Sequence, residues 1–246
     1  MFTPRILLGK RLDLAAVTIA CDGYEWNANA AYDACVADAW MQRQREAAAA
    51  RLSIWDGINY RVVNAEALER CEGSVHLVLG TIRYRYIATL RLLQNEHAKH
   101  ALDPLYHLTT AALICTSDDW YVFGRRAGNG SVDLIGGGAQ PDELEVAAGT
   151  DLERNLVKEI GEEIGIGSGD LRRIACIGVL LSSTSNVLVL SKADLTLTKR
   201  EVERAFGDRS DDEMAEPVFV RPDELAPFLR SLTDYRALIP TLLEDA

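Results

Sequence analysis

The sequence predicts a mixed α/β fold (α/β or α+β) in which a sheet packs between helices. Strand-like apolar runs stand on both sides of one amphipathic helix at residues 151–164, and further helical segments end the chain. A sheet that is followed and covered by helices in this way buries both of its faces. The Asp103-Pro104 break suggests two units, because proline disfavours helix at the preceding residue. We expect a smaller N-terminal α+β domain at residues 1–105 and the main domain at residues 106–246.

Composition narrows the class of partner. The chain has 246 residues, 48% of them apolar, and a net charge of −11. Such an acidic protein lacks the basic surface that nucleic-acid backbones require, so a polyanionic partner must be small. We expect no membrane partner, since no apolar run is long enough to span a bilayer, and a homodimer stays open. The scattered cysteines predict reduced, mostly buried thiols in a cytoplasmic protein: Cys21, Cys35, Cys71, Cys115 and Cys176.

The sequence of the N-terminal unit predicts strands and one long helix. Apolar runs predict strands at residues 5–8 and 15–20, and Asn29 can cap a helix over residues 31–52. A turn at Asp56-Gly57 then leads into a strand, and residues 75–81 form another. Residues 82–86 alternate basic and aromatic side chains, which predicts an edge strand. Its arginines are either solvated, or Arg83 or Arg85 binds a phosphate while a tyrosine stacks on a base.

The main unit alternates strands with turns before and after its central helix. Strands are predicted at residues 107–116, 120–125, 132–135, 171–181, 186–192 and 217–220. Shorter helices follow at residues 201–206, 223–229 and 237–243. Between the third strand and the central helix lies a glycine-rich turn at Gly136 to Gly138, and an acidic loop containing Glu213 precedes the last strand.

The central helix carries an unusual charge pattern. Thr150 and Glu153 predict a capping box, Leu152, Leu156, Ile160 and Ile164 form an apolar stripe, and Gly165 ends the helix. At about 100° per residue, Glu159, Glu162 and Glu163 fall in one arc directly beside that stripe. Three like charges so close repel one another unless they stand in water or share a cation. A solvated helix face and a metal site are therefore both compatible with the acids alone.

The string Lys158 to Ile166, Lys-Glu-Ile-Gly-Glu-Glu-Ile-Gly-Ile, resembles the helical half of the Nudix box at every position but the first. Lysine stands where that box has arginine, and it supplies charge without the planar fork. Gly137 and Glu143 look like the opening of the box. The stretch from residue 144 to residue 157 is longer than the family's usual spacing, which marks a divergent branch.

Segments outside the box resemble one branch of this family, the UDP-glucose and UDP-galactose diphosphatases that carry an N-terminal domain. They are residues 55–61, Leu79 to Arg85, Asp103-Pro104-Leu105 and Val122 to Arg126. The resemblance implies an alpha-beta-alpha sandwich with a mixed sheet. It also implies magnesium-dependent cleavage of a UDP-sugar to UMP and a sugar 1-phosphate.

The expected site follows from the chemistry of a pyrophosphate, which an acidic protein can bind through divalent cations held by oxygen ligands. Glu159 and Glu163 are the expected ligands of Mg²⁺, or of Mn²⁺ as a substitute, and Glu162 adds a bridging or water-mediated contact. The backbone at Gly138 can approach the metal because it has no side chain. Glu163 and Glu213 are candidate general bases, and Glu213 can equally be a solvated loop acid.

Substrate contacts are expected from both units. Arg125 and Arg126 are adjacent on a strand and point to opposite faces, so at most one reaches the phosphates. Tyr60, Tyr84 and Arg85 are the expected contacts to uridine. The four histidines show no ligand spacing and are expected to be structural or exposed.

Two alternatives stay open at this stage. A Nudix hydrolase of another substrate, such as ADP-ribose or a nucleoside triphosphate, would keep the mechanism. A non-catalytic nucleotide-binding module of the same fold would regulate another process. We favour hydrolysis because all three helical glutamates are present, and we expect the N-terminal unit to complete the substrate cleft.

Overall fold

The structure, a computed structural model, describes residues 3–49, 54–100 and 102–244. Within these residues the strands form one ten-stranded mixed sheet with the order β1-β8-β9-β5-β3-β4-β2, while β6 joins β5 to β7 and β10. The strands are β1 (Arg5–Leu8), β2 (Thr18–Glu25), β3 (Ile58–Val62), β4 (His76–Arg83), β5 (His107–Cys115), β6 (Tyr121–Arg126), β7 (Val132–Asp133), β8 (Leu171–Leu181), β9 (Asn186–Leu195) and β10 (Met214–Val220). The pairs β5–β9 and β2–β4 are parallel, and the other strand pairs are antiparallel.

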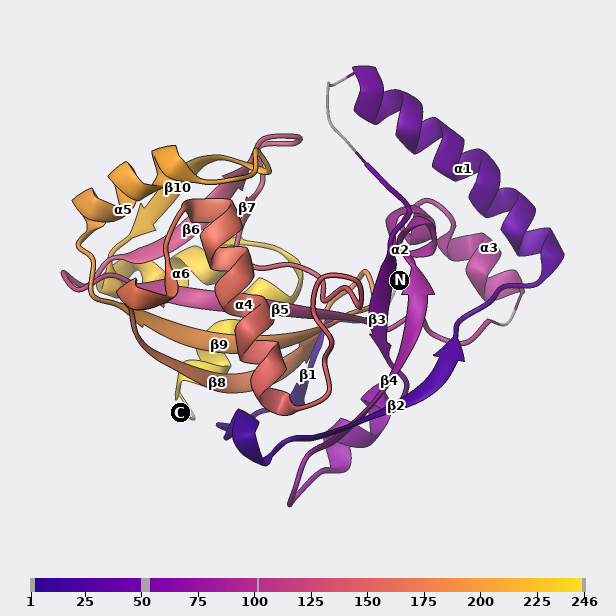
Figure 1. Cartoon of the computed structure of the whole chain (residues 1–246), viewed down its shortest axis with the longest axis horizontal. Coiled ribbons are helices and arrows are strands. Elements are labelled where there is room, and N and C mark those ends of the chain that lie inside the picture. Colours follow the sequence, from indigo (N-terminus) through magenta and orange to yellow (C-terminus); the bar gives the residue numbers. More distant parts are fainter. Residues whose placement is uncertain (1–2, 50–53, 101, 245–246) are drawn as a thin grey trace.

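Helices cover both faces of this sheet (Figure 1). They are α1 (Ala30–Ala49), α2 (Tyr84–Leu90), α3 (Gln94–Lys99), α4 (Gly149–Ile164), α5 (Lys199–Ala205), α6 (Pro222–Ser231) and α7 (Ile239–Glu244). Ala112 and Ile114 of β5 pack in one core cluster with α4, whereas Ala111 and Leu113 pack in another with α6 and α7. The predicted layering of helix, mixed sheet and helix is therefore confirmed.

Helix α4 forms as its sequence predicts, apart from its cap. Leu152, Leu156, Ile160 and Ile164 are at most 1% exposed, and Gly165 ends the helix with φ 72°. The predicted cap at Thr150 is wrong, because the helix already includes Thr150. Instead the Asp151 carboxylate accepts hydrogen bonds from the N–H groups of Ala147 (3.1 Å) and Ala148 (2.9 Å). A carboxylate at the positive end of the helix fulfils the same role.

The N-terminal unit extends the same sheet. β3 pairs with β5 through Arg61 and His107, and β4 and β2 follow outward. Tyr60 and Val62 of β3 share a core cluster with Val146 and Leu152 of the main unit. Figure 1 shows α1, α2 and α3 gathered beside β2, β3 and β4, apart from α4. The boundary between residues 105 and 106 stays a prediction.

The predicted edge strand at residues 82–86 is wrong in its second half. β4 ends at Arg83, and α2 begins at Tyr84. The first amides of α2 find acceptors in a distant turn: Tyr84 N–H donates to the Gly57 carbonyl (2.8 Å) and Arg85 N–H to the Asp56 carboxylate (2.9 Å). An N-terminal cap supplied from elsewhere in the chain thus overrides the alternating pattern.

Other boundaries differ more modestly from prediction. Residues 14–16 form a 3-10 turn before β2, β10 begins at Met214, and a 3-10 helix at residues 234–238 precedes α7. Helix α3 and the 3-10 helix at residues 65–70 were not predicted, and the predicted end of α1 at Leu52 lies outside the described residues. All five cysteines are free thiols, of which only Cys115 and Cys176 are buried, so the expectation of mostly buried thiols is wrong.

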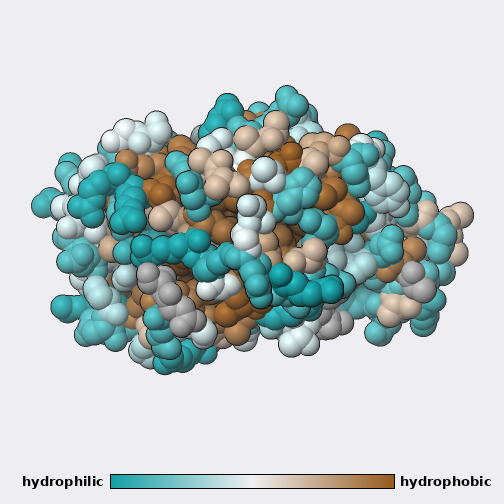
Figure 2. Space-filling view, turned by 90° about the horizontal axis from the view of Figure 1, so that it is seen from below, coloured by the Kyte–Doolittle hydropathy of each residue, from teal (hydrophilic) through white to brown (hydrophobic). Residues whose placement is uncertain are grey.

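In Figure 2 hydrophilic residues cover most of the face shown, and hydrophobic residues gather in the recesses between them. Among the described helices, none combines the length and the apolar character that crossing a bilayer requires.

Candidate active site

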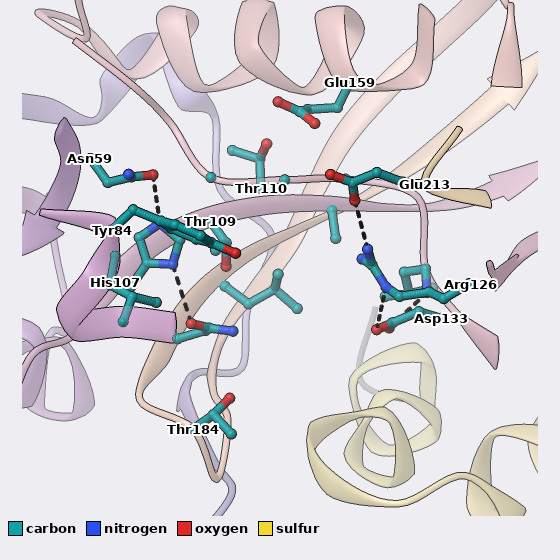
Figure 3. Close-up of a pocket in the computed structure, with 18 of the residues that line it drawn as sticks. Asn59, Tyr84, His107, Thr109, Thr110, Arg126, Asp133, Glu159, Thr184 and Glu213 are labelled. Carbon is teal, nitrogen blue, oxygen red and sulfur yellow. Dashed lines mark hydrogen bonds and ion pairs between the residues drawn. The ribbon is translucent and has the colours of Figure 1, made fainter. Parts of the chain in front are cut away.

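A cavity of about 790 Å³ lies where the two predicted units meet (Figure 3). Its walls come from α4, the glycine turn, the first residues of β5, β9 and α2, and the segment that follows β6. The cavity therefore collects residues that are far apart in sequence. Three walls and a charged cluster, described below, give it chemically different sides.

We call the first group the acidic wall: Glu143, Lys158, Glu159 and Glu162, all of which line the cavity. Lys158 Nζ lies 2.6 Å from Glu143 Oε2, 3.2 Å from Glu159 Oε1 and 3.2 Å from Glu162 Oε2. Burial disfavours the charged ammonium, but its bonds to Glu143 and Glu159 outweigh this and raise the pKa of Lys158. One cation is thus shared by three carboxylates. The long stretch before α4 still brings Glu143 to the helix.

Glu159 is the most buried acid of this wall, with a side chain 12% exposed. Burial raises the pKa of its carboxyl to about 7, although Lys158 acts in the opposite direction. Gly137 of the glycine turn lies directly against this carboxylate, and a Cβ at position 137 would collide with it. The absence of a side chain there lets the backbone come close to Glu159.

Glu163 lies one turn further along α4 and is only 1% exposed. Its carboxylate accepts a hydrogen bond from Gly136 N–H at 2.8 Å. Burial raises the pKa of Glu163 to about 8, and the charge of Arg126 only partly offsets this. Gly136 has φ 150°, and a Cβ there would strike the backbone of β5, so this position requires glycine. The Glu163 carboxylate therefore connects α4 to the glycine turn.

A charged cluster lies across the cavity from α4. Arg126 Nη1 donates to Glu213 Oε2 (2.8 Å), and Arg126 Nε lies 3.6 Å from Asp133 Oδ2. Asp133 also accepts from Arg236 Nη1 and from the Tyr235 hydroxyl, each at 2.8 Å. All five residues line the cavity, and Figure 3 shows Glu159 extending from α4 and Glu213 beside Arg126. Sequence reasoning named Arg126 and Glu213 but missed Asp133, Tyr235 and Arg236.

Arg125 and Arg126 diverge as strand alternation predicts. Arg126 faces the cavity, whereas Arg125 donates from Nε to Glu216 Oε1 at 2.6 Å and from Nη1 to the Gly130 carbonyl at 3.1 Å. Arg125 does not line the cavity. Of the two arginines, only Arg126 is placed to meet a ligand there.

We call the second group the neutral wall: Asn59, His107, Thr109, Thr184 and Asn186. His107 Nε2 lies 3.2 Å from Asn59 Oδ1, and His107 Nδ1 lies 3.3 Å from Asn186 Oδ1. Burial lowers the pKa of His107 to about 4, so the ring is uncharged at neutral pH. The sequence predicts only that the histidines are structural or exposed. The structure shows that His107 is buried and forms part of a cavity wall.

The N-terminal unit adds a third, aromatic wall, formed by Trp55, Tyr84, Ile87 and Arg91. Tyr84 comes from the first turn of α2, and burial raises the pKa of its hydroxyl. The structure does not bring the other two predicted uridine contacts to the cavity. Tyr60 is 5% exposed, and its hydroxyl accepts from Val146 N–H at 3.2 Å. Arg85 pairs with Asp56 at 3.5 Å and lies over the Tyr86 ring.

The residues of the site fit a divalent cation in part. Two largely buried carboxylates, Glu159 and Glu163, stand one turn apart next to a side-chain-free backbone segment, and oxygen donors suit Mg²⁺ and Mn²⁺. Within the described part of the chain, no three His, Cys, Asp or Glu side chains already converge as a metal site. Lys158 pairs with Glu159 and Glu162, and Arg126 pairs with Glu213, so these acids already have cationic partners. The predicted ligand Gly138 lies against His107 and Asn59, while Gly137 lies against Glu159.

No protein-family model and no curated protein matches this sequence. Solved structures with a similar course of the chain include a Nudix hydrolase from Nitrosomonas europaea, at 16% identity, covering 57% of this chain and 87% of the other with a TM-score of 0.38. Another is the MutT protein from Methanosarcina mazei Go1, at 20% identity, 57% and 94% coverage and a TM-score of 0.39. A third is a bifunctional NMN adenylyltransferase/ADP ribose pyrophosphatase from Francisella tularensis complexed with AMP and a manganese ion, at 15% identity, 66% and 47% coverage and a TM-score of 0.42.

Proposed function

We propose that this protein is a divalent-metal-dependent hydrolase of the pyrophosphate bond in a nucleoside diphosphate derivative, with a UDP-sugar as its substrate and UMP and a sugar 1-phosphate as products. The observation that carries the proposal is that Glu159 and Glu162 of one helix line a cavity together with the glycine turn, while Glu163 of the same helix is buried and bonded to Gly136 of that turn. The resemblance of residues 158–166 to the Nudix box supports the same chemistry, and the segments outside the box support the UDP-sugar.

In this proposal Glu159 and Glu163 would hold the metal ion, and Glu162 would contribute through water. Bound Mg²⁺ or Mn²⁺ supplies positive charge to the phosphates and lowers the pKa of a water molecule. The water adds across the P–O–P bridge, so one phosphate gains its oxygen and the other leaves with the bridging oxygen. Glu213, 2.8 Å from Arg126, and Glu163 are the candidates to accept the water's proton.

The rest of the cavity binds the substrate. Arg126 and Arg236 lie on the side opposite α4 and bind phosphate oxygens, for which the guanidinium fork is suited. Trp55, Tyr84 and Ile87 offer aromatic and apolar surface for the base, and Arg91 stands beside them. Because the aromatic wall belongs to residues 1–105, the N-terminal unit completes the cleft in this proposal.

The test is a turnover panel with purified protein and Mg²⁺ on UDP-glucose, UDP-galactose, ADP-ribose and nucleoside triphosphates. We expect UMP and sugar 1-phosphate from the UDP-sugars, and a loss of at least about 100-fold in kcat for Glu163→Gln because a charged ligand is removed. Glu153→Gln changes an acid of the same helix that does not line the cavity, and it should keep wild-type turnover. Turnover of another nucleotide alone would remove the UDP-sugar assignment.

A nucleotide-binding module without turnover is the second candidate, and one observation favours it. Every acid named for catalysis already has a partner: Lys158 for Glu159 and Glu162, Gly136 N–H for Glu163 and Arg126 for Glu213. A site kept in this state would bind ligands without activating water. Binding of UDP-glucose in calorimetry, together with no product from any nucleotide of the panel, would support this candidate over hydrolysis.

A further inference from the structure

The neutral wall leaves hydrogen-bonding groups free in a defined arrangement. Asn59 and Asn186 each place one end of the side-chain amide on His107, at 3.2 and 3.3 Å. Within the described residues, the other end of each amide makes no further hydrogen bond to protein, and both residues line the cavity. Because His107 lies between them, the two amides are fixed relative to each other. Each therefore presents one polar end to a ligand, whichever way the amide is assigned.

Two threonine hydroxyls extend this array. Thr109 Oγ1 donates to the Val187 carbonyl at 3.4 Å, and Thr184 Oγ1 lies 3.1 Å from Ser182 Oγ. A hydroxyl that donates one hydrogen bond can still accept others. None of the five residues of the neutral wall is an acid, a lysine or an arginine. The wall thus offers several neutral donors and acceptors and no charge for a phosphate.

The parallel pairing of β5 with β9 builds this wall. His107 is in register with Asn186 at the first residue of each strand, and Thr109 follows His107 on the same face. Thr184 belongs to the turn that connects β8 to β9. Figure 3 shows His107, Asn59 and Thr184 on the side of the cavity away from Arg126 and Asp133. Four of the five residues of the wall therefore lie on strands of the sheet, and Thr184 lies on the adjoining turn.

The glycine turn joins the neutral wall to the acidic wall. Gly138 lies against His107 and Asn59, whereas Gly137, its neighbour, lies against the Glu159 carboxylate. A phosphate held at the turn near Glu159 consequently places whatever group it carries within reach of the neutral wall. That group must be uncharged and rich in hydrogen-bonding atoms to use this surface.

We propose that the neutral wall is the subsite that binds the hydroxyl groups of the sugar in a nucleoside diphosphate sugar. The proposal rests on the proposed function for the position of the phosphates, and it adds the residues that select the sugar. A base is the less suitable occupant, because stacking requires flat apolar surface and the aromatic wall at Trp55 and Tyr84 provides it elsewhere in the cavity. Hydroxyl groups, which both donate and accept, match amide and threonine groups one by one.

The test compares UDP-glucose with analogues that each lack one hydroxyl of the glucose or the 2′-hydroxyl of the ribose. In the wild-type protein, deletion of a bound glucose hydroxyl should lower kcat/KM by about tenfold or more, because a buried polar group loses its partner. In Asn186→Ala and in Thr184→Ala, the same deletion should cost less than about threefold, since the protein side of that bond is already gone. Asn129→Ala is the matched control. Asn129 lines the same cavity from the loop after β6 and is not part of the neutral wall, so this variant should keep the wild-type discrimination.

The outcomes separate this proposal from the proposed function. If wild-type protein hydrolyses UDP-glucose and Asn186→Ala and Thr184→Ala keep the full discrimination, the subsite is overturned while hydrolysis stands. If the two variants instead lose discrimination only against the ribose analogue, the wall binds the nucleoside and the sugar assignment is overturned. If wild-type protein hydrolyses nothing, calorimetric binding of the same analogues tests the subsite alone. Thermal unfolding of each variant shows whether it is folded.

Discussion

The acidic wall and the neutral wall face one cavity but satisfy their polar groups in opposite ways. In the acidic wall the partners lie within the wall: Lys158 serves Glu143, Glu159 and Glu162. In the neutral wall His107 engages only one end of each asparagine amide. A ligand must therefore displace an existing charge pair in the acidic wall, whereas the neutral wall is ready to bind. Changes in the acidic wall should alter stability as well as chemistry, and changes in the neutral wall should alter discrimination alone.

The largest effect on stability should come from Glu163→Gln. Burial raises the pKa of Glu163 from 4.5 to about 8 in the folded protein, so the folded state holds this proton more tightly than the unfolded chain does. That stabilisation is complete below about pH 4.5 and is lost as the pH rises through about 8. Glutamine has no proton to lose, and its oxygen can still accept from Gly136 N–H. With chelator present, the variant should exceed wild type by about 2–3 kcal/mol more at pH 8 than at pH 5.

Thermal or urea unfolding at the two pH values measures this difference. Glu162→Gln is the control, because the Glu162 side chain is 40% exposed and its charge is largely solvated. It should show little pH-dependent gain. Equal stability of Glu163→Gln and wild type at both pH values would contradict a raised pKa of Glu163 in the folded protein.

Arg125 and Arg126 allow a matched test of the charged cluster opposite α4. Arg126→Ala removes the guanidinium that holds Glu213 and faces the cavity, and kcat/KM for the UDP-sugar should fall by about 10–100-fold, the value of one charge-assisted contact. Arg125→Ala removes the same group one residue earlier, where it pairs with Glu216 outside the cavity. Its activity should stay within about twofold of wild type. Comparable losses in both variants would contradict the placement of a phosphate contact at Arg126.

The acidic helix could be predicted from sequence because its information is local. The stripe from Leu152 to Ile164 and the arc of glutamates follow from helical periodicity, and Gly165 ends the helix as predicted. Strand alternation likewise placed Arg125 and Arg126 on opposite faces. These residues needed no knowledge of which segments lie side by side.

The neutral wall could not be predicted in this way, because it depends on pairing between distant segments. His107 and Asn186 come together only through the parallel register of β5 and β9, and Asn59 arrives from the N-terminal unit. Polar residues at the first position of two buried strands were the available signal. The beginning of α2 at Tyr84 could not be predicted for the same reason, since the acceptors for its first N–H groups come from Asp56 and Gly57. The ion pair between Glu143 and Lys158 also depends on how the long stretch between them folds.

The smallest and most specific effect should come from Lys158→Met, which removes the shared cation from the acidic wall. Glu143, Glu159 and Glu162 would then face one another without compensation. Because the Lys158 side chain is 28% exposed, solvent screens part of the repulsion, and the loss at pH 8 should be about 1 kcal/mol, or about 2–4 °C in Tm. Lys158→Arg keeps the charge, and its Tm should stay close to that of wild type.

Millimolar Mg²⁺ should raise the Tm of Lys158→Met by more than it raises the Tm of wild type, since a divalent cation can take the place of the ammonium among the same carboxylates. Equal Mg²⁺ shifts in Lys158→Met and wild type would show that the metal and Lys158 do not compete for these acids, and would place any metal site away from the acidic wall.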